Sequence, residues 1–173
     1  RGQANEVAKA LEQAGIAFSG DAIQALIEQP IINNLLALCR YLVNPADTIA
    51  AVSLLRGPWC GVTWPTLAEL LTAHPERPLN LMHALGHMPA LNNDEAQRLE
   101  QIFAVLQWAE WKRDRLSLSI WVEQIWLRLG GALSTRSQDL RCVEAILASL
   151  RKAEQLGLGL NLDWLERDIA TSG

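Results

Sequence analysis

Three helices are predicted by residues 35–71, which read LLALCRYLVNPADTIAAVSLLRGPWCGVTWPTLAELL. Apolar side chains recur at helical spacing on both sides of Asn44-Pro45 and again after Thr63. Asn44-Pro45 ends the first pattern, because proline disfavours a helical conformation in the residue before it. Pro45 then opens the second helix, Gly57-Pro58 stops it, and Thr63 is a suitable N-cap for the third.

The rest of the chain has the same helical periodicity and no run of alternating apolar residues that would indicate a strand. Leu and Ala are abundant while Tyr and Phe are scarce, which favours helix over sheet. We predict an all-α fold, an irregular array of about nine or ten helices. The predicted helices cover about residues 3–14, 21–27, 30–43, 45–55, 63–74, 78–85, 94–115, 119–129, 137–156 and 162–169.

Length and composition limit the possible functions. A chain of 173 residues suits about one domain. Its formal net charge is −4, so any contact with DNA must be local instead of resting on overall charge. The three cysteines lack CxxC spacing, which favours a reducing, cytoplasmic compartment, with Cys39 and Cys142 as core thiols. No apolar run approaches the ~20 residues of a membrane span, and the start at Arg1 is consistent with a fragment of a longer protein.

Motifs of catalysis and cofactor binding are absent from the sequence. His83 and His87 lie four residues apart, but Gly86 interrupts their helix and no further ligand follows, so surface histidines are preferred over a zinc site. GxSxG, GxxxxGK(S/T) and GxGxxG do not occur. We therefore expect no catalytic residue, metal or cofactor in this chain, which should not be an enzyme by itself.

The seven tryptophans are unusual for this length. Trp108 and Trp111 lie three residues apart in one predicted helix, and Trp121 and Trp126 lie five apart in the next. Packing between helices is the preferred role of these side chains. The alternative is stacking on the bases of single-stranded nucleic acid.

The turn at residues 56–63 is the best candidate site in the sequence. Gly61 would let a foreign backbone approach closely, and the amides of Val62 and Thr63 would be unpaired at a helix start. Such amides bind anions, and Arg56 would add a charged hydrogen bond to a DNA phosphate. The alternative is a plain corner between helices, with Arg56 bound to carbonyl groups of the preceding helix.

A set of short motifs is spread over the first half of the chain. They are Ala14-Gly15-Ile16, Glu28, Ile32, Leu35-Leu36, Arg40, Asn44-Pro45-x-Asp47, Leu55-Arg56-Gly57-Pro58 and Gly61-Val62. In this order they resemble the UvrD/Rep-type superfamily of DNA helicases, and its AddA/RecB-like branch most of all. Residues 121–131, WVEQIWLRLGG, resemble the second half of the same region.

The resemblance implies that residues 21–173 form the helical subdomain 2B and that residues 1–20 are the edge of the second RecA-like motor domain. ATP and Mg would be bound by other parts of the parent chain, an ATP-dependent DNA helicase or helicase–nuclease of DNA repair or recombination. In that family, subdomain 2B swings on hinges and contacts duplex or forked DNA, partly through backbone amides of a Gly-Ile-Gly turn. The matching positions here are Gly61, Val62 and Thr63.

Two functions therefore remain open. The first is an accessory helicase subdomain whose Arg56, Gly61, Val62 and Thr63 contact DNA phosphates without reading sequence. The second is a helical module that docks on a partner protein and does not touch DNA. The acidic charge balance and the supply of tryptophan favour this second function.

Overall fold

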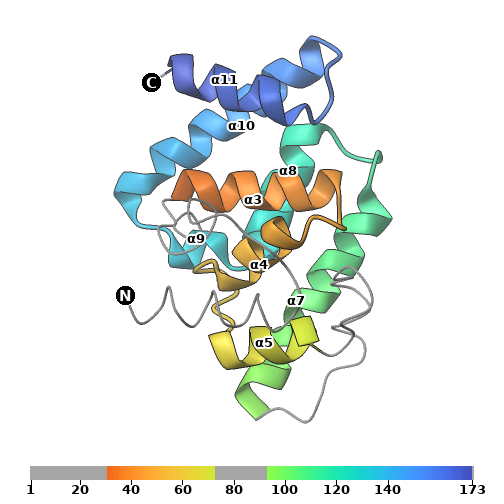
Figure 1. Ribbon diagram of the computed structural model, residues 1–173. Helices are drawn as coiled ribbons and strands as arrows, with labels where there is room; N and C mark the ends of the chain where they lie inside the picture. The colour runs from red at the N-terminus through yellow and green to blue at the C-terminus, as the bar shows by residue number, and fades with distance from the viewer. Residues whose placement is uncertain (1–30, 73–92, 173) are drawn as a thin grey trace.

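Helices account for all the regular secondary structure in residues 31–72 and 93–172, the part of the chain that the computed structural model describes (Figure 1). Eight α-helices and one 3₁₀ helix occur in these residues, and no strand does. The predicted all-α class is confirmed for these residues. The predicted count of nine or ten helices is not confirmed, and the helices predicted at about 3–14, 21–27 and 78–85 lie outside the described residues. The elements are α3 (Ile31–Val43), α4 (Thr48–Arg56), α5 (Trp64–Thr72), α7 (Asn93–Lys112), α8 (Leu118–Arg128), α9 (Gly131–Ser134), η1 (Ser137–Asp139), α10 (Leu140–Gln155) and α11 (Leu162–Ser172).

Helix α3 lies at the centre of the fold, where it packs against α4, α10 and α11 (Figure 1). Its Leu38, Cys39 and Leu42 side chains are almost completely buried. Their spacing of one, three and four residues places them on one face of the helix. Truncating Leu38 to alanine would therefore destabilise the fold by about 2–5 kcal/mol.

The start of α4 differs from the prediction. The sequence predicts a helix from Pro45, but α4 begins at Thr48. The side-chain oxygen of Asn44 accepts a hydrogen bond from the N–H of Ala46, and the N–H of Asp47 donates to the Asn44 carbonyl at 2.9 Å. Asp47 then caps the helix, because its carboxylate accepts the N–H of Ala50 at 3.0 Å. These local bonds hold residues 44–47 in a turn and delay the helix.

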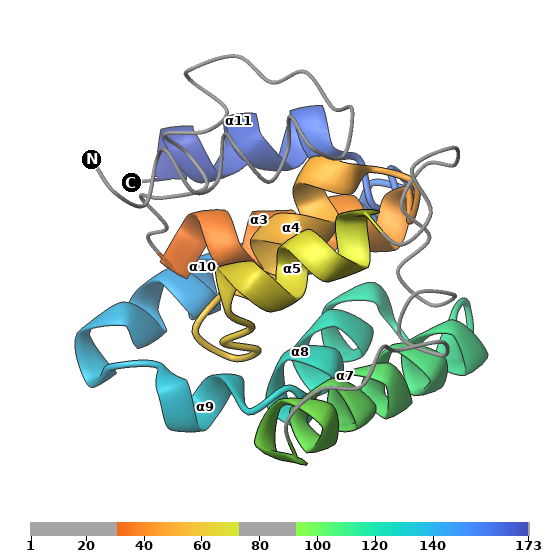
Figure 2. The same ribbon diagram turned by 60° about the horizontal axis from the view of Figure 1, so that its bottom comes forward.

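Helices α7 and α8 lie side by side along one flank of the molecule (Figure 2). Leu99, Ile102 and Leu106 of α7 are buried, as the periodicity predicts. Trp111, for which the sequence predicts packing between helices, is instead 58% exposed. It follows Leu106 by five residues, which rotates it by about 140° around the helix axis and away from these buried side chains.

Buried tryptophans hold α8 in place. Trp121 and Trp126 are both buried, which confirms the predicted packing role for this pair. Nε1 of Trp121 donates to the Ala109 carbonyl of α7 at 3.0 Å. A Cβ atom on Gly131 would lie 2.0 Å from Nε1 of Trp126, so only glycine fits at the start of the short helix α9. Helix α9 lies between two predicted helices and is not itself predicted from the sequence.

The C-terminal helices pack on the centre as the sequence predicts. Val143, Ile146 and Leu150 of α10 are buried, and α10 contacts α3, α8 and α11. The prediction of core thiols holds for Cys39 and not for Cys142, which is only partly buried. Two carboxylates of α11 tie it to its neighbours: Glu166 binds Arg40 of α3, and Asp168 accepts hydrogen bonds from Ser149 and Lys152 of α10.

Candidate nucleic-acid interface

Residues 56–63 join α4 to α5 in a tight turn, which we call the 56–63 corner (Figure 1). The N–H of Gly57 ends α4 by donating to the Ser53 carbonyl at 3.0 Å. The N–H of Gly61 donates back to the Gly57 carbonyl at 2.8 Å. Gly61 has a φ of +60°, a left-handed conformation that favours glycine, and so it allows the chain to reverse here.

The amides of Val62 and Thr63 are both engaged within the protein. The N–H of Val62, a buried residue, donates to the Leu55 carbonyl at 2.9 Å. The N–H of Thr63 donates to Oε1 of Glu95, from α7, at 3.3 Å. The prediction that these amides are unpaired is therefore wrong. The corner folds back on α4, and a carboxylate distant in sequence reaches the start of α5.

Arg56 serves the corner itself. Its Nη1 donates to the Val62 carbonyl at 3.0 Å, and its guanidinium carbon lies 4.5 Å from the centre of the Trp64 ring. Both contacts cross the corner, because Arg56 ends α4 and Trp64 begins α5. This geometry matches the alternative interpretation of a plain corner between helices. The difference is that Arg56 binds the carbonyl of Val62, after the turn, and the prediction named carbonyl groups of the preceding helix. Arg56 therefore positions the corner and is half-buried in it.

Glu95 supplies a negative charge at the start of α5. Besides the N–H of Thr63, its carboxylate accepts a hydrogen bond from the Thr66 hydroxyl. The Thr66 hydrogen bond is the main cause that lowers the pKa of Glu95; the bonds from Thr63 and the nearby Arg98 add to this effect, and burial opposes it. Glu95 is therefore ionised at neutral pH, and it occupies the helix N-terminus where an anion would bind.

Arg98 is a functional candidate that the sequence analysis missed. Its Nη1 donates to the Gly61 carbonyl at 3.0 Å, and its side chain is exposed. It lies three residues after Glu95, so one turn of α7 brings both a carboxylate and a guanidinium to the corner. Pro58 and Thr63 are also exposed there. No local sequence pattern reveals this contact, since 37 residues separate Arg98 from Gly61.

The four predicted DNA-binding residues thus have different surroundings. Thr63 is exposed, Gly61 and Arg56 are half-buried, and Val62 is buried. Binding of DNA by these residues stays a prediction. The predicted mode of contact must change, because the exposed cation that contacts the corner is Arg98, and Glu95 already accepts the N–H of Thr63.

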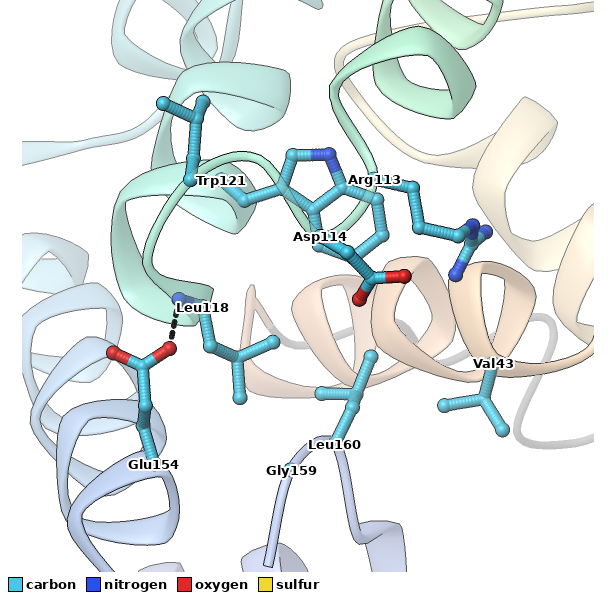
Figure 3. A pocket seen from close by; sticks show the side chains of 9 residues that line it. Val43, Arg113, Asp114, Leu118, Trp121, Glu154, Gly159 and Leu160 are labelled. Carbon is cyan, nitrogen blue, oxygen red and sulfur yellow. Dashed lines mark hydrogen bonds between the residues drawn. The ribbon is translucent and has the colours of Figure 1, made fainter. Parts of the chain in front are cut away.

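A hollow of about 210 Å³ lies where α3, α7, α8 and α10 meet (Figure 3). It is smaller than the ~300 Å³ at which ligand pockets begin. Two of its three charged groups have structural partners: Arg113 donates to the Leu42 carbonyl at 2.9 Å and pairs with Glu110, and Glu154 accepts the N–H of Leu118. The hollow is therefore a joint between helices. It is lined by Val43, Arg113, Asp114, Leu116, Leu118, Trp121, Glu154, Gly159 and Leu160.

Other groups considered in the sequence give no site in the described residues. Burial raises the pKa of Cys39 and of Cys60 to about 12, so both thiols stay protonated at neutral pH. Within residues 31–72 and 93–172, no three His, Cys, Asp or Glu side chains gather as a metal site would require. None of the helices in these ranges combines the length and the apolar composition needed to cross a bilayer. His83 and His87 lie outside the described residues.

Comparisons with protein-family models, with curated proteins and with solved structures give no match. The resemblance to UvrD/Rep-type helicases therefore rests on the motifs within residues 14–71 and 121–131.

Proposed function

We propose that this chain is an accessory, 2B-like subdomain of an ATP-dependent DNA helicase or helicase–nuclease, and that the 56–63 corner contacts duplex DNA. The motifs quoted above and the all-helical fold support this proposal. The observation that carries it is the geometry of the corner: the half-buried Gly61 turns the chain, and the exposed Arg98 binds its carbonyl. A glycine turn with an adjacent arginine can meet a phosphate group closely.

The proposed contact is electrostatic and independent of DNA sequence. Arg98 contacts the phosphate, and the N–H of Thr63 joins it when Glu95 releases that group. Arg56 and Val62 hold the corner in shape. Glu95 opposes binding, because its carboxylate occupies the Thr63 amide and repels the phosphate. ATP and Mg act in the motor domains of the parent chain. Rotation of this subdomain relative to the motor domains then changes how tightly the duplex is held.

Fluorescence anisotropy with a labelled forked duplex at low salt tests the proposal. Arg98→Ala should weaken binding about fivefold and reduce the salt dependence by about one phosphate contact. Glu95→Gln should strengthen binding by a similar factor, because it removes a negative charge beside the phosphate. Arg151→Ala changes an exposed arginine of α10 and serves as the matched control. If Arg98→Ala and Glu95→Gln bind the fork as the control does, the corner does not contact DNA.

The alternative, a module that binds a partner protein, predicts no such effects. Trp121 is buried and Trp108 is partly buried, so these two tryptophans offer little apolar surface to a partner protein. Unchanged binding of the fork by all three variants would favour this function.

A further inference from the structure

The end of α7 presents a large aromatic ring to solvent among basic side chains. Trp111 is 58% exposed, although tryptophan usually buries most of its surface. The Lys112 ammonium lies 4.5 Å from the centre of a Trp111 ring, and the Arg115 guanidinium carbon lies 5.4 Å from it. Both distances allow a cation–π contact. The ring therefore keeps more than half of its surface exposed, and two positive charges lie over it.

A second aromatic and basic pair adjoins the first. Trp108 precedes Trp111 by three residues, so the two indoles are neighbours on one face of α7. The guanidinium carbon of Arg128, from α8, lies 3.9 Å from the centre of a Trp108 ring. Figure 2 shows that α7 and α8 run together along this flank. We call this surface the α7 ridge, and it consists of Trp108, Trp111, Lys112, Arg115 and Arg128.

The charge of the α7 ridge is not neutralised by its neighbours. Lys112, Arg115 and Arg128 form no ion pair with any carboxylate in the described residues. Glu110, two residues before Lys112 in the chain, pairs with Arg113 at 2.6 Å. Asp114 lines the hollow beside Arg113 (Figure 3). Three cations on two indoles therefore remain available to a partner of negative charge.

We propose that the α7 ridge binds single-stranded DNA, with an unpaired base stacked on Trp111 and phosphates held by Lys112, Arg115 and Arg128. Stacking on an aromatic ring needs an exposed base face, which a single strand offers and a duplex does not. The cations supply the phosphate contacts that such sites require. An acidic peptide would use the charges but would leave the indole without a matching π surface. The ridge is separate from the 56–63 corner, so this inference does not depend on the function proposed for that corner.

Fluorescence anisotropy with a labelled oligothymidine of about 12 nucleotides, at low salt, tests the inference. Trp111→Ala should weaken binding about tenfold, and Trp111→Phe should restore much of the loss because it keeps an aromatic face. Replacing Lys112 and Arg115 together with glutamine should lower the salt dependence by about two phosphate contacts. Leu133→Ala, at a side chain that is 95% exposed on α9, and Arg151→Gln, on α10, are the matched controls.

Three outcomes would overturn the inference. The first is oligothymidine binding by Trp111→Ala that equals binding by the parent chain or by Leu133→Ala. The second is no binding of oligothymidine at low salt, which would show that the ridge does not bind single-stranded DNA. The third is much tighter binding of oligouridine than of oligothymidine, which would assign it to RNA. Since Trp111 is exposed, far-ultraviolet circular dichroism should show unchanged helix content in the variants.

Discussion

The 56–63 corner and the α7 ridge both carry arginine next to tryptophan, but they use these residues differently. At the corner, Arg56 is half-buried between the Val62 carbonyl and Trp64, and Glu95 occupies the Thr63 amide. At the ridge, Arg115 and Lys112 lie over an exposed ring and have no carboxylate partner in the described residues. Similar residue types therefore hold the fold together in one region and remain open to a ligand in the other.

The largest difference is expected when one arginine of each region is removed. Arg56→Ala should lower the free energy of unfolding by about 2–3 kcal/mol, because a charged hydrogen bond and a stacked contact are lost from a half-buried site. Arg115→Ala should change it by less than about 0.5 kcal/mol. Urea unfolding followed by circular dichroism measures both values. Equal losses would mean that the two arginines do not differ in role.

Backbone conformation gives the next effect. Gly61→Ala should destabilise the fold by about 1–2 kcal/mol, because its φ of +60° strains any residue with a Cβ atom. Gly159→Ala, at a φ of +61° and with no neighbouring atom within 4 Å, is the matched control for strain alone. Only the first should also weaken binding of forked DNA, since strain at Gly61 would shift the carbonyl that Arg98 binds. If both variants change binding of forked DNA equally, Gly61 does not take part in the contact between the 56–63 corner and DNA.

Acid titration should reveal the contribution of Glu95. Its pKa is lowered in the folded protein, so its stabilising effect is present above the ordinary pKa of 4.5 and is lost as the pH falls through the lowered value. Glu95→Gln should therefore be less stable than the parent by about 0.5–1 kcal/mol at neutral pH. The difference should shrink below pH 4.5. Thermal unfolding at a series of pH values measures this, and a difference independent of pH would contradict the assigned hydrogen bonds.

The smallest effect on stability is expected at the ridge. Trp111→Ala removes a large side chain, yet it should change the free energy of unfolding by less than about 0.5 kcal/mol, because the ring is mostly exposed. Trp121→Ala, at a buried ring of α8, should cost about 3–5 kcal/mol. The same urea titration compares the two. A large loss for Trp111→Ala would show that the ring has a structural role.

Sequence periodicity predicted most of the longer helices in residues 31–72 and 93–172, because their apolar stripes are local features. The buried stripe of α10 and the buried face of α3 follow directly from residue spacing. The helix start at Thr48 was missed because hydrogen bonds within residues 44–47 outweigh the preference of proline for a first turn. The exposure of Trp111 follows from counting five residues from Leu106, which the broad apolar pattern of α7 conceals.

The candidate site was predicted less well, because its chemistry depends on contacts between distant residues. Gly61 and Arg56 were recognised from their local pattern. Glu95 and Arg98 were not, since they reach the corner from α7, 32 and 37 residues along the chain from the groups they bind. The sequence alone does not show which distant side chain will accept the free N–H groups at a helix start, as Glu95 does for Thr63.

Competition between two DNAs tests the distinction between corner and ridge most directly. The chain would be given a forked duplex and an oligothymidine together at low salt, and the ratio of the two bound DNAs would be measured. Arg98→Ala should shift this ratio toward oligothymidine, and Trp111→Ala should shift it toward the duplex. A ratio that neither variant changes would contradict the assignment of separate duplex and single-strand surfaces.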